Sequence, residues 1–171
     1  LNRSVDENPE VNKVAYQNIL LKSSQYQGDI QLSGYIPLSG NHVLKLAVQS
    51  AGIFGNSTIF KNELFRIGGL KTLRGFDEES IYATRYAVFT AEYRILVSLN
   101  SYLAFFSDAG MAKNKYQSVN VNNSFYSAGV GIVYETKLGL LNFSYAVGKR
   151  DDVRFSLREG SKVHFGYVNY F

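Results

Sequence analysis

The chain alternates apolar and polar residues with a period of two over seven separate stretches, and this pattern limits the possible folds most strongly. Successive side chains of a β-strand point to opposite faces, so a period of two predicts strands with one apolar and one polar face. The predicted strands cover residues 28–36, 42–52, 85–98, 102–111, 125–136, 140–148 and 162–171, and a further strand is expected to begin near Ile19. We therefore predict an all-β protein of about seven to eight strands.

The connections between the predicted strands alternate in length along the chain. Short turns at 37–41, 99–101 and 137–139 alternate with long loops at 53–84, 112–123 and 149–160. Such alternation is typical of an antiparallel up-and-down transmembrane β-barrel of the bacterial outer membrane, which has tight periplasmic turns and long outer loops. No stretch approaches the ~20 consecutive apolar residues of a membrane-spanning helix.

The chemistry of the two strand faces also favours a membrane barrel. One face of the stretch 85–98 carries Phe89 and Tyr93, whereas the other carries Glu92. The polar face of the stretch 125–136 contains Gly129 and Gly131. A lipid-facing exterior and a wet lumen explain this difference. The alternative is a soluble sandwich or lipocalin-like barrel, in which the apolar face would point inward.

Composition agrees with many short strands and excludes some kinds of site. The 171 residues include 15 Gly, 13 Tyr and 12 Phe but only two Pro, and they include no Cys. Disulfides and thiolate metal sites are therefore excluded. The net charge of +4 is spread over the chain, so we expect no nucleic-acid partner. We expect neither a metal ion nor another cofactor.

The chain starts at Leu1 and shows no signal peptide, so we expect it to be a piece of a longer protein. A membrane sheet of seven strands has two unpaired edges, and lipid offers no hydrogen bonds to them. We therefore expect the remaining barrel strands to come from the same protein or from another chain.

The segment 53–84 is the longest part of the chain without strand-like alternation. Its residues 65–76 read Phe-Arg-Ile-Gly-Gly-Leu-Lys-Thr-Leu-Arg-Gly-Phe. Gly68 and Gly69 allow tight backbone turning, and Gly75 lets Arg74 and Phe76 diverge sharply. We interpret the segment as a loop that folds back into the barrel lumen, with Arg74 as its anchor.

A guanidinium in a shielded lumen needs carboxylate partners, because an unpaired buried charge is costly. The inward faces of the next two strands offer Glu92 and Asp108. The planar fork of arginine can bind a carboxylate through two parallel hydrogen bonds. The alternative is an exposed loop with a solvated Arg74, in which Glu92 pairs with Arg94 or Lys45.

The chain offers no pattern for catalysis. The glycine-rich loop lacks the Gly-Lys-Ser/Thr ending and the strand-to-helix context of a phosphate loop. His42 and His164 lie at or in predicted strands, and no Ser-Asp arrangement accompanies them. We therefore expect that these residues belong to no enzyme, although an upstream passenger enzyme is compatible with them.

The residues Leu-Arg-Gly-Phe at 73–76 resemble a signature of the bacterial surface antigen superfamily, the BamA/TamA-like outer-membrane assembly factors. That signature is (Val/Leu)-Arg-Gly-(Phe/Tyr). Later strands fit the family in the correct order, with Ala-Glu-Tyr-Arg at 91–94, Phe-Phe-Ser-Asp-Ala-Gly at 105–110, Ser-Ala-Gly-Val-Gly at 127–131 and Leu-Gly-Leu-Leu-Asn-Phe-Ser-Tyr-Ala at 138–146. The resemblance covers the chain from about residue 28 to its end.

The resemblance implies a barrel of about sixteen strands in the bacterial outer membrane, with residues 1–171 as its C-terminal part. It implies that the inserted loop is held by Leu73, Arg74, Gly75 and Phe76, with Arg74 paired to Glu92 and Asp108 beside Phe106. The family also uses a C-terminal strand that ends in an aromatic residue as an assembly signal. Gly166, Tyr167 and Phe171 fit that signal, whereas Asn169 stands where an aromatic is usual.

The implied function is assembly of outer-membrane proteins. The first and last strands of such a barrel pair weakly, so a seam opens and templates incoming strands by β-augmentation. The implied partners are outer-membrane lipid, unfolded outer-membrane protein clients and accessory lipoproteins.

Two other functions stay open. Related barrels anchor or export a passenger, such as a patatin-like lipase, or secrete one partner protein. A Gly-x-Ser-x-Gly motif upstream of Leu1 would favour the passenger, and tandem periplasmic repeats would favour assembly. The last alternative is a plain diffusion pore or a soluble binding barrel.

Overall fold

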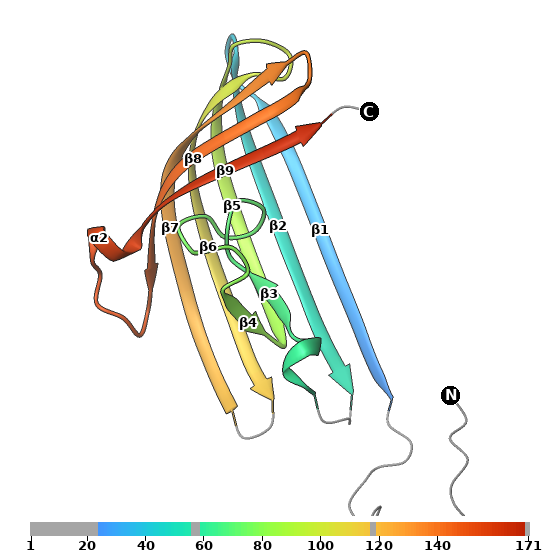
Figure 1. Cartoon of the computed structure of the whole chain (residues 1–171). Coiled ribbons are helices and arrows are strands. Elements are labelled where there is room, and N and C mark those ends of the chain that lie inside the picture. The colour runs from blue at the N-terminus through green and yellow to red at the C-terminus, as the bar shows by residue number, and fades with distance from the viewer. Residues whose placement is uncertain (1–23, 56–58, 117–118, 170–171) are drawn as a thin grey trace, which may run out of the picture.

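The computed structural model describes residues 24–55, 59–116 and 119–169, and most of these residues form one antiparallel sheet. The sheet contains seven strands in the order β1-β2-β5-β6-β7-β8-β9 (Figure 1). They are β1 (Gln25–Pro37), β2 (His42–Gly55), β5 (Arg85–Leu96), β6 (Tyr102–Tyr116), β7 (Val119–Thr136), β8 (Gly139–Arg150) and β9 (Ser161–Asn169). The predicted all-β, up-and-down fold is confirmed, as an open part of a barrel wall.

The two faces of the sheet differ in the way that a membrane barrel requires. Large apolar side chains are exposed on one face: Ile30, Leu32, Val48, Phe89, Phe105, Val130, Ile132, Phe143 and Phe165. Phe105 is 52% exposed, whereas its neighbours on the other face, Phe106 and Asp108, are 5% and 1% exposed. A soluble sandwich or lipocalin-like barrel would bury the apolar face instead. The distribution of exposure therefore favours the membrane alternative.

The segment between β2 and β5 packs against the polar face of the sheet. It contains the 3-10 turn η1 (Lys61–Glu63) and two short strands, β3 (Phe65–Ile67) and β4 (Ile81–Ala83), which pair with each other. Ile67, Leu73 and Ala83 form a buried cluster with residues of β5 and β7. Figure 1 shows β8 and β9 curving over this segment, so that it lies within the concave side of the sheet.

The long strands extend beyond the predicted boundaries. The prediction of a polar loop at 112–123 is wrong, because β6 and β7 pair from Ala112 with Asn123 out to Tyr116 with Val119. Backbone hydrogen bonds hold this extension, so the Asn-rich sequence does not prevent it. Within 53–84, β2 continues to Gly55, and β3 and β4 add strands where we expected none.

The other described residues add little regular structure. A four-residue helix, α2 (Leu157–Gly160), lies in the connection between β8 and β9. The strand expected near Ile19 and the terminal Phe171 lie outside the described residues. Across the ranges that the structure describes, every helix is too short or too polar to cross a membrane.

Candidate functional site

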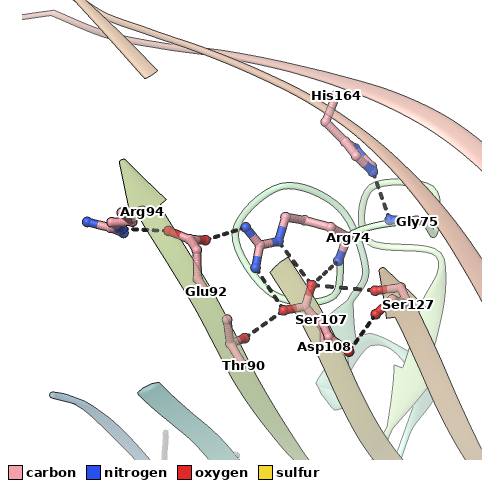
Figure 2. A network of polar contacts seen from close by, with 9 residues as sticks. All are labelled: Arg74, Gly75, Thr90, Glu92, Arg94, Ser107, Asp108, Ser127 and His164. Atoms are coloured by element: carbon pink, nitrogen blue, oxygen red, sulfur yellow. Dashed lines mark hydrogen bonds and ion pairs between the residues drawn. The ribbon is translucent and has the colours of Figure 1, made fainter. Parts of the chain in front are cut away.

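Arg74 lies at the centre of a polar cluster between the sheet and the segment that is inserted in the sequence between β2 and β5, called the inserted segment below (Figure 2). Its Nη1 donates a hydrogen bond to Oε2 of Glu92 over 2.6 Å. Its Nη2 and Nε donate to Oδ1 and Oδ2 of Asp108 over 2.8 and 3.0 Å, which is the two-pronged pairing that suits a guanidinium. The structure therefore brings together the three residues that the sequence singled out.

An aromatic ring supports the guanidinium from one side. The Cζ atom of Arg74 lies 3.5 Å from the ring centroid of Phe106, which is within the range of a cation–π contact. Phe106 pairs across the sheet with Gly129, and a Cβ atom at Gly129 would come within 2.6 Å of the Phe106 ring. The missing side chain of Gly129 thus makes room for the ring on which Arg74 lies.

Further donors satisfy the two buried carboxylates. Oγ1 of Thr90 donates to Asp108 over 2.8 Å, and the backbone N–H of Arg74 donates to the same carboxylate over 3.3 Å. Nε of Arg94 donates to Glu92 over 2.7 Å, so the pairing that we considered as an alternative exists beside the Arg74 pair. A buried ion pair is tolerated when its remaining lone pairs are bonded, and this cluster meets that condition.

The protonation of Arg74 reflects two opposing influences. Burial lowers the pKa of Arg74, but hydrogen bonding and charge attraction from Asp108 and Glu92 raise it, and the net result is a pKa above the ordinary value. The guanidinium therefore stays charged inside the concave side of the sheet.

His164 is a contact that the sequence did not reveal. Its Nε2 accepts a hydrogen bond from the backbone N–H of Gly75 over 3.1 Å, so this nitrogen carries no proton (Figure 2). His164 lies on β9 and is 5% exposed. The sequence predicts only a polar group at a strand end or in the lumen here, and it gives no signal for the contact with Gly75.

Close backbone approach fixes the position of Gly75. Its φ of +87° is a conformation that favours glycine, and a Cβ atom at Gly148 would come within 2.4 Å of the Gly75 carbonyl oxygen. Beside them, the ring of Phe76 packs edge-on against Phe125 with centroids 5.3 Å apart. The motif therefore contacts β7 and β8 as well as β5, β6 and β9.

The start of the motif forms a tight turn held by local hydrogen bonds. Gly68 and Gly69 have φ angles of +114° and +91°. The N–H of Gly68 donates to Oγ1 of Thr72 over 2.8 Å, and the N–H of Gly69 donates to the carbonyl oxygen of Leu73 over 3.0 Å. Leu73 is fully buried in the cluster beneath the segment.

The residues of the expected C-terminal signal lie apart from the Arg74 cluster. Gly166 faces Leu70 of the inserted segment, since a Cβ atom at Gly166 would come within 2.4 Å of that side chain. The hydroxyl of Tyr167 donates to the carbonyl oxygen of Leu138 at the short-turn end of the sheet. Phe171 lies outside the described residues.

A comparison with protein-family models matches residues 11–167 to the Omp85 superfamily domain. The chain belongs to the Omp85 superfamily. At a coarse level this assigns it to protein assembly or secretion at the bacterial outer membrane, in a superfamily whose members are generally not enzymes. A search of curated proteins finds no match.

Among the residues that the structure describes, no group of three or more His, Asp or Glu side chains is arranged to hold a metal ion. The cluster around Arg74 contains fixed charges whose partners are all within the chain. Its ion pairs and hydrogen bonds hold the segment against the sheet.

Proposed function

We propose that this chain forms the C-terminal half of a barrel of about sixteen strands that assembles or inserts outer-membrane proteins. In this proposal residues 53–84 are a lumen-inserted loop, and Arg74 is its anchor. The observation that carries the proposal is the half-buried Arg74 shared between the buried carboxylates of Glu92 and Asp108 on neighbouring strands. Because carboxylates on two neighbouring strands bind the Arg74 side chain, the loop is held in one position against the sheet.

In this proposal an incoming client strand pairs with an edge strand of the sheet. β1 and β9 each have one unpaired side within the described sheet, and lipid cannot satisfy their backbone groups. Further strands complete the barrel, and weak pairing at a seam beside β9 lets an incoming strand add by β-augmentation. Gly166, Tyr167 and Phe171 lie at or near the end of that strand in the sequence, where an assembly signal would act.

The anchor links the loop to the seam strand. Arg74 binds the wall at β5 and β6, while the next residue, Gly75, is bonded to His164 on β9. A loop held at both places keeps β9 at a fixed position over the sheet. We infer that this brace sets how easily the seam at β9 opens.

The competing function uses the same wall for another task. A barrel of this superfamily could anchor or export a passenger domain, or secrete one partner protein. The anchored loop would then act as a plug whose release opens the lumen. Both functions need the barrel, so the test must measure the activity as well as the stability of the barrel.

The test uses the intact protein in lipid vesicles with an unfolded outer-membrane barrel protein as the client. Arg74→Ala is expected to slow client insertion at least tenfold in the assembly function. Arg66→Ala is the matched control, because Arg66 belongs to the same segment but is exposed, with a 3.7 Å ion pair to the exposed Glu79 and a contact over the Tyr82 ring. Unchanged insertion by folded Arg74→Ala would contradict the proposal, and a gain in passenger release would favour the competing function.

A further inference from the structure

A groove of about 900 Å³ lies on the apolar face of the sheet, near the end where the long segment between β2 and β5 joins the strands. Two rows of register partners run across its floor. One row is Gly28, Gly52, Arg85, Lys113 and Asn122, and the next is Ile30, Ser50, Ala87, Met111 and Ser124. The groove forms because the residues of these rows on β1 and β2 include glycines and a small serine side chain.

Two cations lie side by side in the first row. Arg85 and Lys113 are direct register partners, both are exposed, and the guanidinium of Arg85 lies 4.4 Å from the ring centroid of Phe54. None of the ion pairs among the described residues includes either cation. Like charges directly opposite each other destabilise a sheet, so this pair favours an external anion.

The carboxylates near the groove do not neutralise these cations. Asp29 pairs in register with the buried Ala51, so it belongs to the opposite face of the sheet. Asp151 also borders the groove, and its Oδ2 accepts a hydrogen bond from the backbone N–H of Ser124 over 3.0 Å. Neither carboxylate is within ion-pair distance of Arg85 or Lys113 among the described contacts.

Beyond the two rows the surface becomes apolar. The next row toward the middle of the sheet contains Leu32, Val48 and Phe89, all exposed on the same face. Cations at the long-loop end followed by an apolar band match the order of groups in a lipid, whose charged headgroup precedes its acyl chains. In an outer-membrane barrel the long connections lie on the outer side.

We propose that this groove binds a phosphorylated lipid of the outer leaflet, with its phosphate between Arg85 and Lys113. The acyl chains lie over Leu32, Val48 and Phe89. Arginine and lysine are the usual phosphate-binding side chains, and basic pockets at the membrane surface bind phosphorylated headgroups. The proposal depends on the placement of the barrel in the outer membrane and is independent of the assembly function.

The first test measures lipid binding by the intact protein in detergent, by native mass spectrometry with lipid A before and after removal of its phosphates. The phosphorylated form is expected to bind more tightly. The double variant Arg85→Gln/Lys113→Gln removes two charges near the headgroup and is expected to lose roughly thirtyfold in affinity. Lys71→Gln/Lys137→Gln removes the same charge elsewhere and is expected to retain binding. Equal binding of both lipids, or equal loss in both double variants, would overturn the proposal.

The second test fills the groove without changing its charge. A Cβ atom at Gly28 would meet no atom within 4 Å, so Gly28→Leu is expected to fold and to occupy the hollow. Gly28→Leu should weaken binding of phosphorylated lipid A severalfold. If the double charge variant fails to fold, the result for Gly28→Leu alone tests the proposal. Unchanged lipid binding by Gly28→Leu would overturn the proposal. Displacement of the lipid by millimolar inorganic phosphate would indicate a free-phosphate site and would also overturn it.

Discussion

The backbone N–H of Gly75 donates a hydrogen bond to Nε2 of His164, and this bond joins the inserted segment to the last strand of the sheet. The preceding residue, Arg74, binds Glu92 and Asp108 on β5 and β6. Arg74 and Gly75 are consecutive in the chain but contact distant strands. In the sheet order, β9 lies three places from β6 and four places from β5. This short brace across the concave side is the basis of the predictions below.

Removing the acceptor at His164 should loosen the segment. His164→Phe leaves the N–H of Gly75 buried without a partner, which costs about 1–3 kcal/mol of the free energy of unfolding. His164→Gln keeps an oxygen that can accept the bond and should cost less. Denaturant unfolding of the barrel in detergent measures both variants. Equal stability of His164→Phe and the unchanged protein would show that the bond contributes nothing.

The Arg74–Asp108 pair should show strong energetic coupling. Asp108→Asn leaves the guanidinium only partly compensated, and breaking a buried pair in this way costs about 3–5 kcal/mol. Arg74→Met combined with Asp108→Asn should cost clearly less than the sum of the single changes. A double-mutant cycle on unfolding free energies measures this coupling. The same cycle on the exposed pair of Arg66 and Glu79 should give less than about 1 kcal/mol. Additive effects at Arg74 and Asp108 would contradict the pairing.

A single methyl group at Gly148 should displace the motif. Gly148→Ala places a Cβ atom against the carbonyl of Gly75, and the cost of such overpacking is about 1–3 kcal/mol. Gly34→Ala on β1 is the matched control, because a Cβ atom there meets no atom within 4 Å. Proteolysis of residues 65–80 should become faster in Gly148→Ala only. Equal rates in both variants would indicate that the close approach is absent in solution.

A charge on the apolar face should destabilise the barrel in lipid. Phe105→Arg places a guanidinium among exposed apolar side chains of β6, and the cost of a lipid-facing arginine rises to about 2–4 kcal/mol toward the membrane midplane. Leu99→Arg, in the turn before β6, is the control and should cost little. Folding yields in vesicles at increasing urea concentration measure the difference. A tolerated Phe105→Arg would mean that this face does not contact lipid.

The strands could be predicted from the sequence because alternation is a local property. Phe89 and Tyr93, which the alternation places on the apolar face of β5, are exposed in the structure, while Glu92 and Asp108 are buried. The extension of β6 and β7 was missed because backbone pairing holds it and its side chains are polar. Composition therefore gave a misleading signal for residues 112–123.

The contacts of the motif depend on residues far apart in the chain. The bond between Gly75 and His164 spans 89 residues, and no spacing rule connects them. Arg74 was recognisable because a charge between glycines and aromatics needs a partner, and the next two strands offered carboxylates. His164 and Gly148 carry no such signal, since their roles follow from the curvature that brings β8 and β9 over the segment. Thr90 bonds Asp108, its register partner on the adjacent strand, and the register between β5 and β6 was not predicted.

The most direct test asks whether Arg74 holds the segment against the sheet when the protein is in the outer membrane of intact cells. This chain contains no cysteine, so Leu73→Cys introduces a unique thiol within it at a position that is 0% exposed. A membrane-impermeant maleimide applied to intact cells should label Leu73→Cys far more slowly than the exposed Lys71→Cys. Adding Arg74→Ala should remove this protection and raise the labelling rate of Leu73→Cys at least tenfold. Fast labelling with Arg74 in place, or protection that survives Arg74→Ala in a folded barrel, would contradict the anchored loop.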